Sequence, residues 1–204
     1  MGDINPAPLF YTAYFFEQYK GWIGASVVVL LGAVCVTIYN RMVRSWTRVG
    51  QAWSDIDVQL RRRASLVPNL VETVKGYAGH ESHVFEEVTR TRSALVEAKG
   101  AAEAARADAE LTQALSRLFA VAENYPQLSA SENFLELQKE LSDVEEKIAY
   151  ARQFYNANAQ DYNTRIRAFP GLLFAFLLRF DPAAFFQAPE EARSEIKVDF
   201  HDLK

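Results

Sequence analysis

The feature that most constrains this chain is an uncharged stretch of nineteen residues near its N-terminus. Residues 21–39 read GWIGASVVVLLGAVCVTIY and contain no Asp, Glu, Lys or Arg. As an α-helix rising about 1.5 Å per residue, the stretch is close to 30 Å long, the hydrocarbon thickness of a bilayer. The sequence therefore predicts a transmembrane helix at 21–39. The segment before it, 1–20, is rich in aromatic residues and is suited to the headgroup region.

Three other N-terminal signals fit this stretch less well than a retained anchor. A cleaved signal peptide has a basic region before its apolar core, whereas Lys20 is the sole basic residue before position 21. A lipobox ending at Cys35 would need a small residue where Val34 stands. N-myristoylation of Gly2 would need Ser or Thr where Pro6 stands. We therefore interpret the stretch as an uncleaved anchor.

The charges that flank the stretch predict its orientation. Three arginines follow it within nine residues, and one lysine precedes it closely. Because basic residues stay on the cytoplasmic side, we expect a short N-terminus outside and the rest of the chain in the cytoplasm. The residues predicted to mark the anchor and its interfaces are Trp22, Tyr39, Arg41, Arg44 and Arg48.

The region 40–169 has the periodicity of α-helices. Apolar residues recur at alternating steps of three and four from Trp46 to Tyr77, and a second such stripe runs from Phe134 to Tyr162. Gly100 either divides the stretch between them or lies within one helix, so three or four helices are expected. The predicted fold class is all-α: a transmembrane helix followed by an antiparallel up-and-down bundle. The predicted core residues are Trp53, Ile56, Leu60, Leu70, Leu141, Ile148, Tyr155 and Tyr162.

The last region, 170–204, is an apolar, Phe-rich segment followed by a tail. Residues 171–178 read GLLFAFLL, which is too short to span a bilayer. The segment either covers the end of the bundle core or lies on the membrane or on a partner subunit. In the second case the contact residues are Phe174, Phe176 and Phe180.

No pattern in the sequence indicates catalysis or metal binding. His80 and His83 are three residues apart, whereas a zinc-binding HEXXH motif places its histidines four apart. The sequence has no nucleophile elbow, phosphate-binding loop or dinucleotide fingerprint. We therefore expect no enzyme activity, no metal and no cofactor.

The cluster Arg61–Arg62–Arg63 is the feature closest to an anion-binding patch. The formal net charge of −4 does not favour a nucleic-acid binder. Along a continuous helix, Arg61 lies about 33 Å beyond Tyr39, too far for direct attraction to lipid headgroups. We expect these arginines to pair with the acidic start of the last helix, and Arg63, which lies on the apolar stripe, to need a buried carboxylate. The expected acidic partners are Glu132, Glu136, Glu140, Asp143, Glu145 and Glu146.

A series of long motifs occurs between residues 39 and 200. Residues 52–63 read AWSDIDVQLRRR, 66–77 read LVPNLVETVKGY, 122–126 read AENYP, 133–138 read NFLELQ and 151–156 read ARQFYN. Together with YN at 39–40, YNT at 162–164 and VDF at 198–200, the series closely resembles the LemA family. The departures are the long aromatic N-terminus and the very apolar 171–178.

The resemblance implies a bacterial inner-membrane protein with an extracytoplasmic N-terminus and a cytoplasmic helical bundle, and it carries no activity with it. We expect a non-catalytic scaffold that self-assembles and organises envelope or membrane proteins. There are two alternatives. One is a membrane-shaping polymer that inserts its Phe-rich segment into lipid, and the other is a regulatory subunit of a membrane protease. The expected partners are the bilayer, further copies of the chain and other membrane proteins. Small residues in the anchor (Gly24, Ala25, Gly32, Ala33) permit close helix association.

The orientation can be tested with engineered cysteines at Asn5 and Ala130. If the arginines hold the bundle in the cytoplasm, an impermeant thiol reagent added to intact cells labels a cysteine at position 5 and not one at position 130. The reverse labelling pattern would show that the orientation is wrong.

Overall fold

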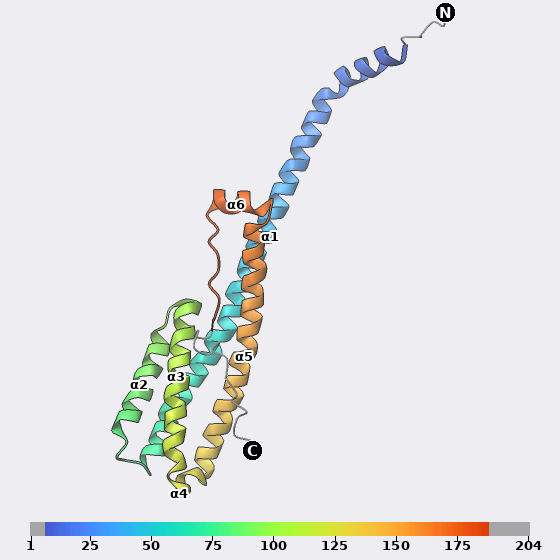
Figure 1. Ribbon diagram of the computed structural model, residues 1–204. Coiled ribbons are helices and arrows are strands. Elements are labelled where there is room, and N and C mark those ends of the chain that lie inside the picture. The colour runs from blue at the N-terminus through green and yellow to red at the C-terminus, as the bar shows by residue number, and fades with distance from the viewer. Residues whose placement is uncertain (1–6, 188–204) are drawn as a thin grey trace, which may run out of the picture. The chain divides into compact units, whose positions relative to one another are not determined.

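The computed structural model describes residues 7–187, with side chains from residue 19 onward, and this part of the chain contains no strand. Its elements are α1 (Ala7–Lys75), α2 (Ser82–Glu97), α3 (Gly100–Glu123), α4 (Pro126–Ser129), α5 (Glu132–Arg167) and α6 (Gly171–Leu178) (Figure 1). The prediction of an all-α fold with a long N-terminal apolar helix is confirmed.

The described residues form two compact units, which share α1 and α5. We call residues up to Arg44 together with Arg165–Phe180 the anchor unit, and Ser45–Thr164 together with 181–187 the bundle unit. The anchor unit thus contains the apolar half of α1 and all of α6. The bundle unit contains the heptad stripes.

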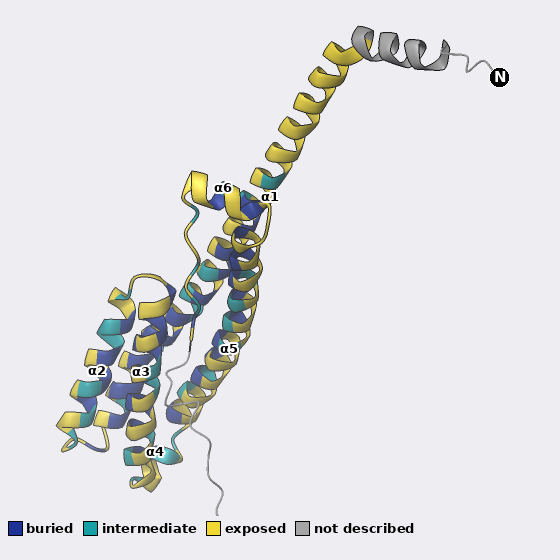
Figure 2. Cartoon of the chain, turned by 45° about the horizontal axis from the view of Figure 1, so that its top comes forward, coloured by how far each residue is buried: buried dark blue, intermediate teal, exposed yellow. Residues whose placement is uncertain are grey.

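The core of the bundle unit is built from the predicted stripes. In α1, Ile56 and Leu70 are fully buried and Leu60 is nearly fully buried. In α5, Ile148 and Tyr162 are nearly fully buried. The buried residues lie on the inner faces of the helices, where apolar side chains leave water (Figure 2). Leu141 and Tyr155 are also buried, whereas Trp53 is half-buried.

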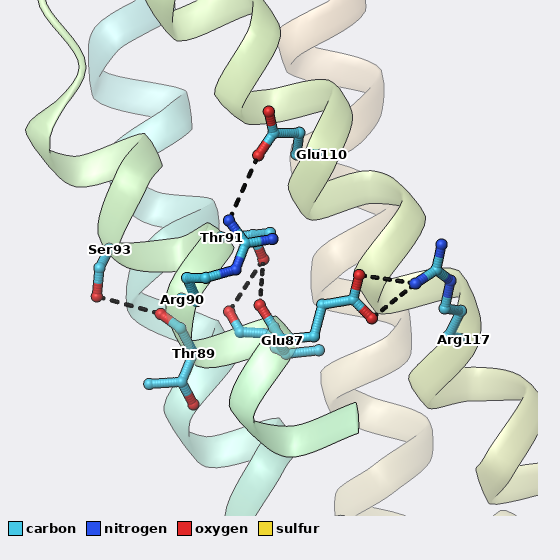
Figure 3. Close-up of polar contacts among 8 residues, drawn as sticks. Glu87, Thr89, Arg90, Thr91, Ser93, Glu110 and Arg117 are labelled. Atoms are coloured by element: carbon cyan, nitrogen blue, oxygen red, sulfur yellow. Dashed lines mark hydrogen bonds and ion pairs between the residues drawn. The ribbon is translucent and has the colours of Figure 1, made fainter. Parts of the chain in front are cut away.

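Gly100 separates two helices rather than lying within one. α2 ends at Glu97, and Gly100 has φ +77°, a left-handed conformation that glycine adopts without a steric penalty. The bundle therefore has four main helices, the larger of the two numbers that the sequence left open. On the surface between α2 and α3, Arg117 Nη1 donates to both carboxylate oxygens of Glu87 at 2.7 Å, and Arg90 lies 3.9 Å from Glu110 (Figure 3).

Arg61 and Arg63 pair with other carboxylates than those predicted. Arg63 is only 4% exposed, and its Nη1 donates to Asp108 Oδ1 of α3 at 2.6 Å. Arg61 instead pairs with Asp57, one turn earlier in α1, at 2.8 Å. The expected pairing of Arg61 and Arg63 with the acidic start of α5 is therefore wrong. The expectation of a buried carboxylate for Arg63 is met, because a charge removed from water needs a close counter-charge.

Burial is the main influence on Asp108. Loss of hydration raises the pKa of its carboxyl group, while the positive charge and the hydrogen bond of Arg63 act in the opposite direction. Arg63 Nε has no hydrogen-bond partner among the described residues. The pair therefore joins α1 to α3 at the cost of an incompletely satisfied guanidinium group.

Removing one partner of this pair should destabilise the protein more than removing both. Asp108→Leu leaves the Arg63 charge buried and unpaired, which should lower the free energy of unfolding by about 3–5 kcal/mol. The double variant Arg63→Met/Asp108→Leu should recover most of that loss. Denaturant unfolding of the full chain in detergent, followed by circular dichroism, measures both.

The surface pair Asp57–Arg61 provides the matched control. Asp57→Ala should leave the unfolding midpoint almost unchanged, since exposed ion pairs contribute little. If Asp108→Leu proved as mild as this control, the buried pair would have no structural weight.

Candidate functional site

The apolar half of α1 has the length and composition of a membrane anchor, as predicted. Every residue from 19 to 37 is exposed, and Trp22 is 77% exposed (Figure 2). Among the described residues, α1 is the one helix long and apolar enough to cross a membrane. The hydroxyls of Ser26 and Thr37 donate to carbonyl oxygens four residues earlier, at 2.8 Å each. The helix therefore satisfies these polar groups internally, as a lipid environment requires.

The anchor unit continues at the end of α5, where the chain turns sharply into α6. A Cβ at Gly171 would collide with the carbonyl oxygen of Arg165, so this turn accommodates only glycine. Gly171 and Ala175 are buried, whereas the large side chains of α6 are mostly exposed (Figure 2). The large side chains of α6 therefore remain exposed within the described part of the chain.

The three predicted contact residues of this region differ in their surroundings. Phe176 is 87% exposed, and Phe174 is half-buried. Phe180 packs edge-on against Tyr39, with ring centroids 6.4 Å apart. Both rings belong to the anchor unit. The end of the uncharged stretch and the end of α6 are thus held together by aromatic packing.

In the bundle unit, two Asn side chains of α5 bind the main chain of the segment 181–187, which is neither helix nor strand. Asn163 Nδ2 donates to Ala183 O at 2.9 Å, and Ala183 N donates to Asn163 Oδ1 at 2.8 Å. Asn156 makes the same two bonds with Phe186, at 3.0 and 2.9 Å. Each amide group thus satisfies one backbone donor and one backbone acceptor of a segment that has no strand partner.

Two tyrosines, each directly before one of these asparagines, extend the contact. The Tyr162 hydroxyl donates to Asp181 O at 2.8 Å, and the Tyr155 hydroxyl donates to Ala184 O at 2.6 Å. Burial raises the pKa of both phenol groups, and the charge of Asp181 adds to this at Tyr162. Both hydroxyls therefore remain protonated and available as donors.

The seven-residue repeat of the Tyr–Asn pairs matches the spacing of the segment that they bind. Seven residues of α-helix advance about 10.5 Å, and three residues of extended chain advance about 10 Å. Accordingly, partners seven residues apart in α5 bind positions three residues apart in 181–187. The sequence revealed the repeat but not its ligand, because the segment it binds has no periodicity of its own.

Aromatic packing seals this contact on the side of α1. The ring of Trp53 lies 6.0 Å from that of Tyr155 and 6.5 Å from that of Phe186, and Trp46 lies 5.2 Å from Tyr162. Phe186 is almost fully buried. Trp53, predicted as a core residue, thus lies beside the C-terminal segment and keeps one edge in water.

A groove lies between α1 and α5 of the bundle unit. Its apolar floor includes Val58, Tyr150 and Phe154, each at least half exposed. Gln59 Oε1 is buried in its wall without a hydrogen-bond partner among the described residues. The charged groups along its rim are Asp55, Asp143, Glu146 and Lys147. An apolar strip with a charged rim is the anatomy of a protein-binding surface.

The remaining candidates of the sequence lie apart from these surfaces. His80 and His83 are exposed beside the start of α2. No group of three His, Cys, Asp or Glu side chains within the described part of the chain is arranged to hold a metal ion. Arg41, Arg44 and Arg48 lie on exposed positions of α1 directly after the uncharged stretch.

Comparison with known proteins agrees with this architecture. The family model described as the LemA family matches residues 52–200. Magnetosome protein MamQ 2 of Paramagnetospirillum magneticum is 28% identical over 186 residues, covering 78% of this chain and 68% of that protein. Protein LemA of Metamycoplasma hominis is 28% identical over 169 residues, covering 81% of this chain and 75% of that protein. Magnetosome protein MamQ of Magnetospirillum gryphiswaldense is 26% identical over 192 residues, covering 80% of this chain and 71% of that protein.

The Asn contacts predict a local change in hydrogen exchange. Asn163→Ala removes two hydrogen bonds to Ala183, each contributing about 1 kcal/mol, so the Ala183 amide should exchange roughly 30-fold faster. The Phe186 amide, held by Asn156, should change much less. Exchange resolved to single amides in the full chain measures the difference.

Asn158 serves as the control, because its side chain bonds to Phe154 O of its own helix. Asn158→Ala should leave Ala183 exchange as in the unmodified protein. Equal acceleration at Ala183 in both variants would mean that the effect is a general loosening of α5.

Proposed function

The chain belongs to the LemA family, and from this premise we propose that it is a non-catalytic, membrane-anchored helical scaffold that self-assembles and organises other membrane or envelope proteins. The groove between α1 and α5 is the observation that carries the proposal. It offers an apolar strip on two long helices, which is suited to binding another helix. The magnetosome proteins among its relatives are named after a cellular structure and not after a reaction, which is in keeping with a scaffold.

We propose that the protein resides in the bacterial cytoplasmic membrane with its N-terminus outside and its bundle in the cytoplasm. The basic residues Arg41, Arg44 and Arg48 after the span support this orientation. The bilayer is then one partner, and other membrane proteins are reached within its plane. Nucleic acid is not an expected partner, because the net charge is −4.

The groove also supports the proposed self-assembly. Its rim combines Lys147 with the carboxylates of Asp143 and Glu146. A patch that carries both signs of charge can pair with its own copy across a two-fold axis, the lysine of one copy facing a carboxylate of the other. In the anchor, a Cβ added at Gly24 or Gly32 would meet nothing within 4 Å, so this face of α1 is open to a second helix.

One observation favours the alternative function of membrane shaping. The exposed apolar side chains of α6 are of the kind that a curved or deformed leaflet accommodates. A polymer of copies that each insert α6 would combine both roles. Tubulation of liposomes by the purified full-length protein would support this alternative.

Self-assembly through the groove predicts a change of mass on mutation. The unmodified full chain in mild detergent or in large nanodiscs should have the mass of two or more copies by native mass spectrometry. Tyr150→Glu places a charge on the apolar floor and should shift the protein toward the single-chain mass.

Val96→Glu, at an exposed apolar position of α2 outside the groove, is the control and should retain the oligomer. A single-chain mass for the unmodified protein in nanodiscs would contradict self-assembly. An unchanged oligomer in Tyr150→Glu would show that the groove is not the interface.

A further inference from the structure

Four of the five exposed leucine and phenylalanine side chains of α6 lie on one face of that helix. Leu172 and Leu173 are 52% and 61% exposed, and Phe176 and Leu177, one turn later, are 87% and 75% exposed. Residues four apart share a helix face, so these four form a single surface. The small residues Gly171 and Ala175 occupy the buried side.

This surface is too apolar to be stable in water. Every residue of α6 is apolar, and the exposed set consists of leucines and a phenylalanine without a polar neighbour on the same helix. An isolated eight-residue helix is marginal in water, so α6 depends on what it contacts. A contiguous exposed apolar surface of this kind marks a lipid or protein contact.

Two features of the anchor unit indicate lipid. The Phe180 ring packs against Tyr39, the last residue of the uncharged stretch, which joins α6 to the end of the candidate span. The surrounding sequence is basic: residues 38–44 and 165–180 contain five arginines and no Asp or Glu. These arginines are Arg41, Arg44, Arg165, Arg167 and Arg179.

We propose that α6 is a second membrane contact, a helix that lies in the leaflet on the bundle side of the span. Leu172, Leu173, Phe176 and Leu177 enter the acyl chains, and the five arginines lie at the level of the lipid phosphates, where anionic headgroups attract them. The left-handed C-cap at Arg179 turns the chain out of α6 toward 181–187. The protein thus contacts the membrane twice, through the span in α1 and through α6 in the leaflet at the end of the span that leads to the bundle.

The proposal rests on the proposed anchoring of α1, and Cys35 allows the two to be tested separately. Cys35 is the single cysteine of the chain and lies in the span. The unmodified full chain is labelled at Cys35 with an environment-sensitive fluorophore in detergent and reconstituted into vesicles of phosphatidylcholine and phosphatidylglycerol. Cys35→Ser/Phe176→Cys and Cys35→Ser/Val96→Cys are labelled in the same way. Circular dichroism confirms that each labelled chain is folded.

We expect lipids brominated in their acyl chains to quench the probes at 35 and 176 several-fold more than the probe at 96. Iodide in the aqueous phase should quench only the probe at 96. If the probe at 35 is not quenched by bromolipid, the anchoring itself fails. If 35 is quenched but 176 responds to iodide as 96 does, α6 lies in water and the inference is overturned. Protection of 176 from both quenchers also overturns it, since protein then covers α6.

Discussion

The constraint on which the rest of this structure depends is that residues 21–39 contain no charged side chain. A helix satisfies its own backbone polar groups, and here Ser26 and Thr37 satisfy their hydroxyls within it as well. Such a segment is stable in lipid without a protein partner, which explains why nearly all its side chains are exposed. The same helix α1 continues to Lys75 and supplies the buried stripe of the bundle unit. One continuous helix therefore combines a first half that is apolar on every side with a second half that is apolar on one face.

Inside the bundle unit, polar contacts determine which elements meet. Hydrophobic burial alone would allow α1, α3 and α5 to slide or rotate against one another. The Arg63–Asp108 pair joins one position of α1 to one of α3, because a buried charge is strongly unfavourable without its partner. Asn156 and Asn163 do the same for the segment 181–187, since a shift by one residue would leave both amides and the bound backbone groups unpaired. The register of the fold thus depends on few side chains.

Features set by local spacing could be predicted from the sequence, whereas features set by pairing between distant segments could not. The charge-free run and the heptad stripes placed the anchor and the core residues Ile56, Leu70 and Ile148, because these depend only on periodicity. Trp53 lies on the same stripe but is half-buried, and its contact with Phe186 could not be predicted, because the segment 181–187 has no recognisable pattern. Arg63 was expected to need a carboxylate. That this carboxylate belongs to Asp108 could not be predicted, because six acidic residues of the last helix were equally plausible partners in the sequence. The positive φ of Gly100 likewise could not be predicted, because it depends on the turn between α2 and α3, which forms only when the two helices pack.

The two apolar surfaces that the fold leaves open differ in charge, and this difference supports the proposal that they bind different partners. The groove between α1 and α5 has three carboxylates and one lysine along its rim, so an anionic bilayer would repel it, whereas a protein partner can pair with charges of both signs. The sequence beside α6 and the end of the span (38–44 and 165–180) contains arginines and no Asp or Glu, which favours anionic lipid and disfavours a basic protein surface. Membrane attachment and assembly therefore need not compete for the same residues. In the proposed arrangement, with α1 and α6 in the membrane, the groove stays available to neighbouring copies and other membrane proteins, whose effective concentration would be raised by anchoring in the same bilayer.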